Sequence, residues 1–210
     1  MTDLFPQPPE VASPVSVDAD LAAVRSFLAL RRSAGKEHLG EPAPSPDVLE
    51  AILRVGLRVP DHRRVEPWRL IVVEGAAREA LGELLAARHL MLHPDASDAE
   101  LAEERRRTLR APVTVFVVHS PHQEHKTPEW EQQLSTGAAC HQIGLAAKAA
   151  GLDAVWLTEW LCYDKVISRH LGLADHERLA AQILIGTPST PSPERPRPDM
   201  ALKVTHWSGG

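Results

Sequence analysis

The stretch Val113-Thr-Val-Phe-Val-Val118 decides the fold, because it is an unbroken run of β-branched and aromatic residues. Such residues are enriched in strands, and an uninterrupted apolar run is typical of a strand that is buried on both faces. We therefore predict a central strand here. Leu70–Val73 predicts a second buried strand for the same reason. Shorter strands are predicted at Ala154–Leu157 and Gln182–Ile185, and a last edge strand at Val204–Trp207.

Helical patterns surround these strands without strict βαβ alternation. A first helix starts near Asp18 or Asp20, and Leu21, Val24, Phe27 and Leu28 form its apolar stripe. Ser45 and Pro46 predict the start of a second helix, and Pro60 predicts its end. Further helices are predicted at Ala76–Leu92, Asp98–Leu109, Pro128–Ala150 and Asp164–Leu171. The order of these elements predicts an α+β fold, in which helices cover a sheet.

Length and charge exclude several classes of protein. The chain has 210 residues, which suits one domain at 17–210 after a proline-rich tail at 1–16 that we expect to be disordered. The net charge of −5 argues against binding to nucleic acid. Arg105-Arg-Arg107 is expected to be a solvated helix face. Without a signal peptide or a long apolar span, we expect no membrane association and a cytoplasmic protein.

Two clusters of positive charge lie near predicted turns. Arg31-Arg32-Ser33 ends the first helix, and Arg58-Val-Pro-Asp-His62 follows about thirty residues later. The guanidinium group offers a planar fork of donors that matches phosphate oxygens, so these clusters suit an anionic small molecule. The alternative is that Arg31 and Arg32 are solvated charges at a helix C-terminus.

Common catalytic signatures are missing from the sequence. There is no dinucleotide-binding GxGxxG after a strand, no GxxxxGK[ST] loop and no GxSxG elbow, so the chemistry is expected to depend on a cofactor. Histidines offer one alternative, a zinc site. His89 and His93 lie four residues apart, and His119, His122 and His125 are evenly spaced, but the HExxH glutamate is missing. Cys140 and Cys162 predict no disulfide framework.

An ordered set of motifs resembles the nitroreductase family, and its compact bacterial NAD(P)H nitroreductases above all. These motifs cover roughly residues 20–207 and are Arg31-Arg32-Ser33, Val59-Pro-Asp-His62, Glu66-Pro-Trp-Arg-Leu-Ile-Val-Val-Glu74, His125-Lys-Thr-Pro-Glu-Trp-Glu-Gln132, Trp156-Leu157-Thr158 and Ile185-Gly-Thr-Pro188. The resemblance implies a mixed central sheet covered by helices, bound FMN, and a homodimer that holds each flavin between two subunits. It also implies that the helix Pro128–Ala150 lies at the dimer interface and that residues 200–207 extend onto the partner.

The resemblance also implies roles for individual residues. Arg31 and Ser33 hold phosphate or ribityl oxygens, and Arg32 contacts the ribityl chain or the pyrimidine side of the ring. Arg58 and His62 approach the flavin of the neighbouring subunit. The segment Trp156-Leu157-Thr158 lies along the ring, with Leu157 contributing only its backbone, and Arg197, with Arg195, resembles a basic pair that some members place on the phosphate.

The activity implied by this resemblance needs no protein nucleophile and no obligatory general acid. NADH or NADPH passes a hydride to the flavin, and a nitroaromatic or quinone then takes the electrons at the same site. Two alternatives stay open from the sequence: a flavin-binding protein without turnover, and a zinc hydrolase built on the histidines. The small side chains of Ser135–Ala139 predict close contact with a neighbouring helix.

Overall fold

The protein is described here from a computed structural model, which covers residues 4–15 and 20–209. Its strands are β1 (Leu39–Gly40), β2 (Trp68–Glu74), β3 (Val113–His119), β4 (Asp153–Leu157) and β5 (Arg178–Pro188). Its helices are α1 (Leu21–Leu30), α2 (Pro46–Gly56), α3 (Ala76–Leu92), α4 (Asp98–Arg107), α5 (Glu129–Ala149) and α6 (Lys165–His170), with the 3-10 turns η1 (Trp160–Cys162) and η2 (Met200–Leu202).

The sheet is built around β3, in which every residue is buried. The strand order is β1-β5-β3-β2, and β4 also pairs with β5. Phe116 of β3 lies opposite Ile71 of β2 and Gln182 of β5. The α+β class predicted from the sequence is confirmed. The sheet differs from the expected mixed one in that all four pairings in the described part of the chain are antiparallel.

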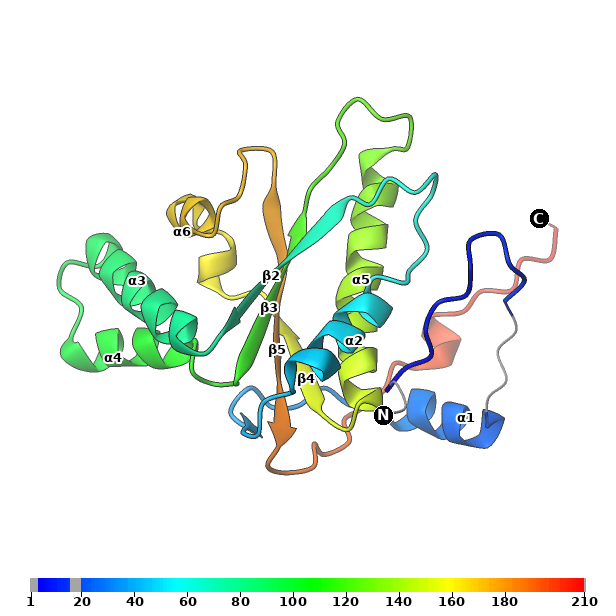
Figure 1. The fold of residues 1–210 in the computed structure, drawn as a ribbon, viewed down its shortest axis with the longest axis horizontal. Coiled ribbons are helices and arrows are strands. Elements are labelled where there is room, and N and C mark those ends of the chain that lie inside the picture. Colours follow the sequence, from blue (N-terminus) through cyan, green and yellow to red (C-terminus); the bar gives the residue numbers. More distant parts are fainter. Residues whose placement is uncertain (1–3, 16–19, 210) are drawn as a thin grey trace.

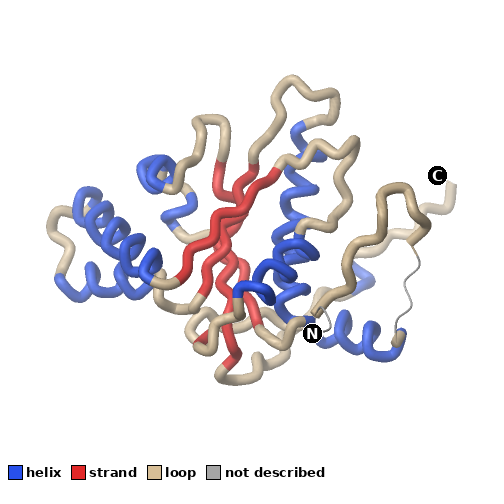
Figure 2. Tube along the Cα trace, viewed as in Figure 1, coloured by secondary structure: helices blue, strands red, loops and turns tan. Residues whose placement is uncertain are grey.

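Helices cover both faces of the sheet (Figure 1). On one face α2 and α5 pack against the strands, and Ile52, Ile143 and Ile183 belong to the core between them. On the other face α3 and α6 cover a second cluster that contains Phe116 and Leu161. Side chains of β3 alternate between these two clusters, as the two-residue period of a strand requires. Figure 2 shows the same arrangement, with the strands running between the two groups of helices.

The start of α2 is confirmed, but its end is not. Ser45 Oγ accepts a hydrogen bond from Val48 N, and Pro46 is the first helical residue. The helix ends at Gly56 rather than at Pro60, so Arg58 and His62 both lie beyond its end, in irregular chain. Gly56 lies so close to α5 that an added Cβ would collide with Ile143. This close approach packs α2 against α5. It therefore determines where the following segment, which carries Arg58 and His62, begins relative to α5.

Two other expectations from the sequence are wrong. β2 is an edge strand, with Val72 exposed and Val73 buried, because it pairs with β3 on one side only within the described residues. Residues 204–207 are irregular and follow the turn η2, because no strand of the described chain pairs with them. Leu21 and Leu28, which belong to the apolar stripe predicted for α1, are 60% and 62% exposed.

The two terminal regions lie on the same side of the body as α1. Figure 1 shows α1 and the C-terminal segment beside α5, extending away from the sheet. Residues 4–15 run as irregular chain; Phe5 packs against the α2–α5 core, and Arg54 Nη1 donates to Pro6 O at 3.3 Å. Among the described helices, none combines the length and the apolar character that crossing a membrane requires.

Candidate functional site

A cavity of about 260 Å³ lies where the exit of α1 meets β4 and α5. The exit of α1 contributes Arg31, Arg32 and Ser33, and β4 contributes Trp156. The structure therefore brings together four residues that the sequence predicted as a binding site. From α5, the cavity wall is formed by Cys140, His141, Gly144, Leu145 and Lys148.

The segment 31–33 is held rigidly at the edge of this cavity. Arg31 leaves helical geometry, and its backbone N–H still donates to Phe27 O at 3.0 Å. Three residues later, Ala34 N donates to Ala154 O of β4 at 3.1 Å. Ser192 Oγ donates to Ser33 O at 2.9 Å. Arg31 Nη1 approaches Ser33 Oγ at 3.4 Å, so the hydroxyl accepts one bond and can donate another.

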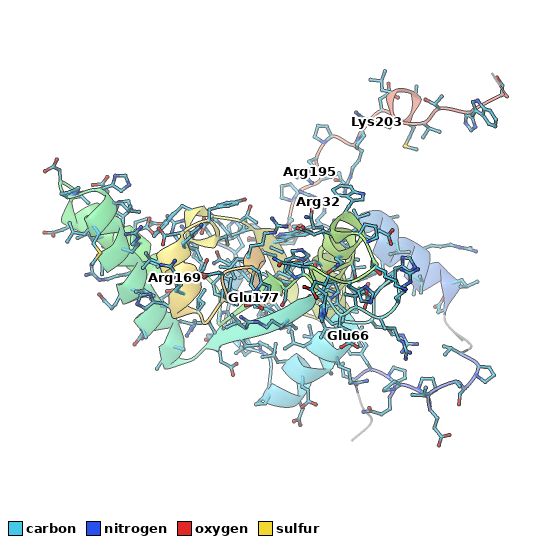
Figure 3. All side chains as sticks on the ribbon, turned by 90° about the horizontal axis from the view of Figure 1, so that it is seen from above. Arg32, Glu66, Arg169, Glu177, Arg195 and Lys203 are labelled. Carbon is cyan, nitrogen blue, oxygen red and sulfur yellow. The ribbon has the colours of Figure 1, made fainter. Side chains whose placement is uncertain are left out.

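Arg32 is the most informative side chain of the cavity. Its side chain is 17% exposed, and its Nε donates to Pro193 O at 3.0 Å. Its Nη1 is buried and has no hydrogen-bond partner among the described residues. A buried unpaired donor is costly, and most such groups in proteins have a partner. Because Arg32 lines the cavity, an acceptor bound there is a candidate partner for this donor. Figure 3 shows Arg32 next to the C-terminal segment that carries Arg195.

Arg195 and Arg197 belong to that C-terminal segment, but they do not line the cavity within the described structure. Arg197 Nη2 lies 2.9 Å from Glu194 Oε1, and its side chain is half exposed. Glu194 Oε1 also lies 3.7 Å from Arg32 Nε. The carboxylate therefore neutralises part of the positive charge here, and the phosphate role of Arg197 stays a prediction.

The segment Trp156-Leu157-Thr158 lies at the end of β4. Trp156 is 46% exposed and lines the cavity. Leu157 packs its side chain against the cluster that contains Ala34 and Leu184, and it does not line the cavity. Thr158 is exposed directly after the strand. The roles of Leu157 and Thr158 toward a ligand therefore stay predictions.

Arg58 and His62 lie apart from this cavity in the described chain. Arg58 is exposed and lines a different cavity, with Phe5 and neighbouring prolines. His62 is exposed, and its Nδ1 lies 2.6 Å from Glu131 Oε2 of α5. One chain therefore does not bring the two predicted clusters of positive charge together.

The turn that carries His62 is fixed to α5 by Ser135. Ser135 Oγ donates to Pro60 O at 2.9 Å and accepts from Trp68 Nε1 at 3.2 Å. Asp61 Oδ2 accepts from Glu66 N at 2.7 Å and closes the turn. Part of the small-sided run 135–139 therefore serves contacts inside the chain, while Gly137 and Ala138 remain half exposed.

A buried network of ion pairs lies at the C-terminal end of α4, and here the prediction of a solvated helix face is wrong for Arg107. Its side chain is 14% exposed and forms a two-pronged pair with Glu104, at 2.7 and 2.9 Å. Arg107 Nη1 also lies 2.9 Å from Glu159 Oε1. The hydrogen bond with Glu104 raises the pKa of Arg107 above its ordinary value, although burial opposes this.

The same network holds Glu159 in its charged form. Burial acts to raise the pKa of Glu159, but the hydrogen bond and charge of Arg107, together with Arg110, lower it on balance. Two features of the sequence could have indicated this network: glutamates three residues before arginines in 103–107, and an acidic residue directly after Thr158. The cavity residues His141, Gly144 and Lys148 are also spaced by single helical turns, a pattern that marks one face of α5.

The histidines do not support a zinc site. His119 is buried with its Nδ1 2.8 Å from Thr136 Oγ1, and burial lowers its pKa. The rings of His89 and His93 lie 4.6 Å apart, and His89 Nδ1 lies 4.0 Å from Glu104 Oε1. Across the described chain, no three histidine, cysteine or carboxylate side chains are grouped as metal ligands. Cys140 and Cys162 are both buried and unbridged.

Comparison with known proteins identifies the family. The model of the nitroreductase family matches residues 28–187. A protein of Escherichia coli strain K12, "Putative NAD(P)H nitroreductase YdjA", is 34% identical over 158 residues, which cover 75% of this chain and 84% of the relative. The fold resembles a nitroreductase-like family protein from Bacillus cereus, with a TM-score of 0.74 at 21% identity, covering 93% of this chain and all (100%) of that one.

A second solved structure, a nitroreductase with bound FMN from Desulfitobacterium hafniense DCB-2, has a TM-score of 0.62 at 23% identity, covering 88% of this chain and 97% of that one. At these identities the two structures show the fold alone. The family match and the similarity to the Escherichia coli relative show family membership as well, because both cover most of the chain. The chain therefore belongs to the nitroreductase family of oxidoreductase enzymes.

Proposed function

We propose that this protein is an FMN-dependent oxidoreductase that takes electrons from NADH or NADPH and passes them to a nitroaromatic or quinone-type acceptor. The Escherichia coli relative carries NAD(P)H in its name, and FMN is bound in a solved structure with the same fold. The observation in this chain that carries the proposal is the cavity at 31–33, where a buried guanidinium nitrogen of Arg32 lacks a partner.

The residues of the cavity fit an anionic cofactor. Arg31 and Arg32 each carry a permanent positive charge, and Ser33 adds a hydroxyl. Lys148 also lines the cavity, but its charge is matched by Asp153 at 2.6 Å. The excess positive charge therefore lies at 31–32, where the phosphate or ribityl oxygens of FMN would be held.

Bound FMN supplies the two-electron redox chemistry, in which a hydride from NADH or NADPH is followed by electron transfer to the acceptor at one site. The protein binds and orients the cofactor. Arg31 and Ser33 hold phosphate or ribityl oxygens, and the backbone after Trp156 donates to polar edges of the ring. The positive charge of Arg32, near the ribityl chain or the pyrimidine side, favours the reduced anionic state. Neither a protein nucleophile nor a general acid is needed in this scheme.

The working unit in this proposal is a homodimer. Apolar side chains are exposed along α1, along α5 and near the C-terminus, and exposed apolar patches of this kind mark interfaces. They include Leu28, Leu30, Trp130, Leu134, Met200, Leu202 and Trp207. Pairing of two copies would bring Arg58 and His62 of one chain to the flavin held by Arg31–Ser33 of the other. A cytoplasmic location stays a prediction.

Turnover tests this function against the alternative of a flavin-binding protein without activity. Purified protein loaded with FMN is mixed with NADH or NADPH and with a quinone or a nitroaromatic, and the oxidation of reduced nicotinamide is followed at steady state. We expect turnover that requires both FMN and the acceptor. Stoichiometric FMN binding with no turnover for either donor and either acceptor class would favour a flavin-sequestering protein.

A further inference from the structure

Glu159 lies at the centre of the buried network at the C-terminal end of α4. Its side chain is 15% exposed and meets three cations. Arg107 Nη1 and Arg110 Nη1 each lie 2.9 Å from Oε1, and Arg110 Nη1 also lies 3.1 Å from Oε2. The third cation is Lys36, whose Nζ lies 3.2 Å from Oε1. These pairs are partly withdrawn from water, where charges interact more strongly than at an exposed surface.

The partners of Glu159 connect two stretches of chain that the proposed function assigns to the cofactor. Lys36 follows Ser33 by three residues, and Glu159 follows Thr158 directly. The Lys36–Glu159 pair therefore links the end of the 31–33 segment to the end of the 156–158 segment. A main-chain bond from Ala34 N to Ala154 O, at 3.1 Å, links the same two stretches on the other side.

The network also fixes this linkage to the body of the protein. Arg110, whose side chain is 6% exposed, pairs with Glu103 at 2.9 Å and with Glu37 at 3.2 Å. Trp160 Nε1, next to Glu159, donates to Glu104 Oε2 at 3.0 Å. The loop after β4 is therefore bound at two adjacent residues to the C-terminal end of α4. Removing one partner from such a network leaves buried charge unpaired and loosens the segments it joins.

We propose that Glu159 is a positioning residue, which sets the spacing between the segment that holds the phosphate end of the flavin and the segment that lies along its ring. This inference rests on the proposed function, because it concerns the same cofactor. Glu159 acts through its neighbours and does not itself contact the substrate. Its carboxylate binds Lys36 and Arg107 and thereby keeps both segments at one separation.

The test replaces Glu159 by glutamine, which keeps the shape but removes the charge. The matched control is Glu177→Gln. Glu177 is buried to a similar degree (6% exposed) and forms a two-pronged pair with Arg69, but it joins β2 to the loop before β5 and does not line the cavity. Both variants lose one buried carboxylate, and both are expected to lower the melting temperature.

The two variants should differ in how they bind FMN. We expect Glu159→Gln to weaken FMN binding about three- to thirty-fold, the range for residues that couple to a site without touching the ligand. The visible circular dichroism of the bound flavin should also change. Glu177→Gln should alter affinity by less than about twofold, as expected for a distant, independent site. Equal effects of both variants on FMN affinity, with unchanged visible dichroism, would overturn the positioning role.

A second pair of variants keeps the test decisive if Glu159→Gln does not fold. Lys36→Met removes the direct link between the two segments, and its control, Arg105→Met, removes a cation of similar exposure (41% and 44%) that pairs with Glu83. Lys36→Met should weaken FMN binding at least about twofold more than Arg105→Met. No difference between these two would contradict the inference.

Where Glu159→Gln folds, the double variant with Lys36→Met completes a cycle, and the two effects on FMN affinity should be less than additive. Full additivity would show that Lys36 acts on the cofactor independently of Glu159 and would reject the proposal. Wild-type protein that binds no FMN would refute the proposed function and this inference with it. Wild-type protein that binds FMN while the variants show no coupling refutes the inference alone.

Discussion

Replacing Arg31 by alanine should separate cofactor binding from protein stability. The side-chain hydrogen bond from Arg31 Nη1 to Ser33 Oγ is long, at 3.4 Å, and the backbone bond to Phe27 O survives the substitution. The free energy of unfolding of the flavin-free protein should therefore change by less than about 0.5 kcal/mol. A charge-assisted hydrogen bond to an anion contributes roughly 1.5–3 kcal/mol. Its loss predicts FMN binding that is weaker by about ten- to a hundred-fold.

The assay is a titration of flavin-free protein with FMN, followed by the quenching of flavin fluorescence. Arg105→Ala is the control, because Arg105 is an exposed arginine whose side chain pairs with Glu83 away from the cavity. Arg107 is unsuitable as a control, since it is buried in the network around Glu159. If Arg31→Ala and Arg105→Ala changed FMN affinity equally, the cavity at 31–33 would not be the phosphate site.

Two further predictions concern the assembly and its pH dependence. When Arg31→Ala and Arg58→Ala chains are co-expressed, the isolated heterodimer should recover about half the wild-type flavin content. The reason is that one of its two sites carries both defects and the other carries none. No recovery of flavin content would contradict a site shared between subunits. The hydrogen bond from Arg69 holds the pKa of Glu177 at about 2, below its ordinary 4.5. The contribution of the Arg69–Glu177 pair to the free energy of unfolding is therefore complete above pH 4.5 and is lost as the pH falls toward 2. The free energy of unfolding of Glu177→Gln, measured with urea, should therefore fall less steeply between pH 4.5 and pH 2 than that of wild type. The same dependence of this free energy on pH in both proteins would show that the pair does not act in this way.

The elements with strong local signals were predicted well from the sequence. β3 is a continuous β-branched run, and Ser45-Pro46 caps and starts α2 as expected. Ala76–Leu92 was predicted to the residue as α3. Arg31–Ser33 and Trp156 lie in one cavity because the turn after α1 is bonded to β4, a contact that only the resemblance to a family indicated.

Features that depend on distant partners were not predictable in this way. The apolar run of β2 suggested a buried strand, but its place at the edge follows from pairing order, which the run itself does not encode. Arg107, like the exposed Arg106, follows a glutamate by three residues, and this pattern does not encode its further contact with Glu159 from another part of the chain. The separation of Arg58 and His62 from the cavity is also a tertiary property.

The measurement that tests the central claim most directly is the visible absorption spectrum of the purified protein, with identification of the flavin released on denaturation. We predict a yellow protein, or one that turns yellow and retains the colour after incubation with FMN and removal of the excess, and we predict that the released cofactor is FMN. Protein that stays colourless after incubation with excess FMN, or that releases FAD instead, would contradict the assignment of the Arg31–Ser33 cavity to this cofactor.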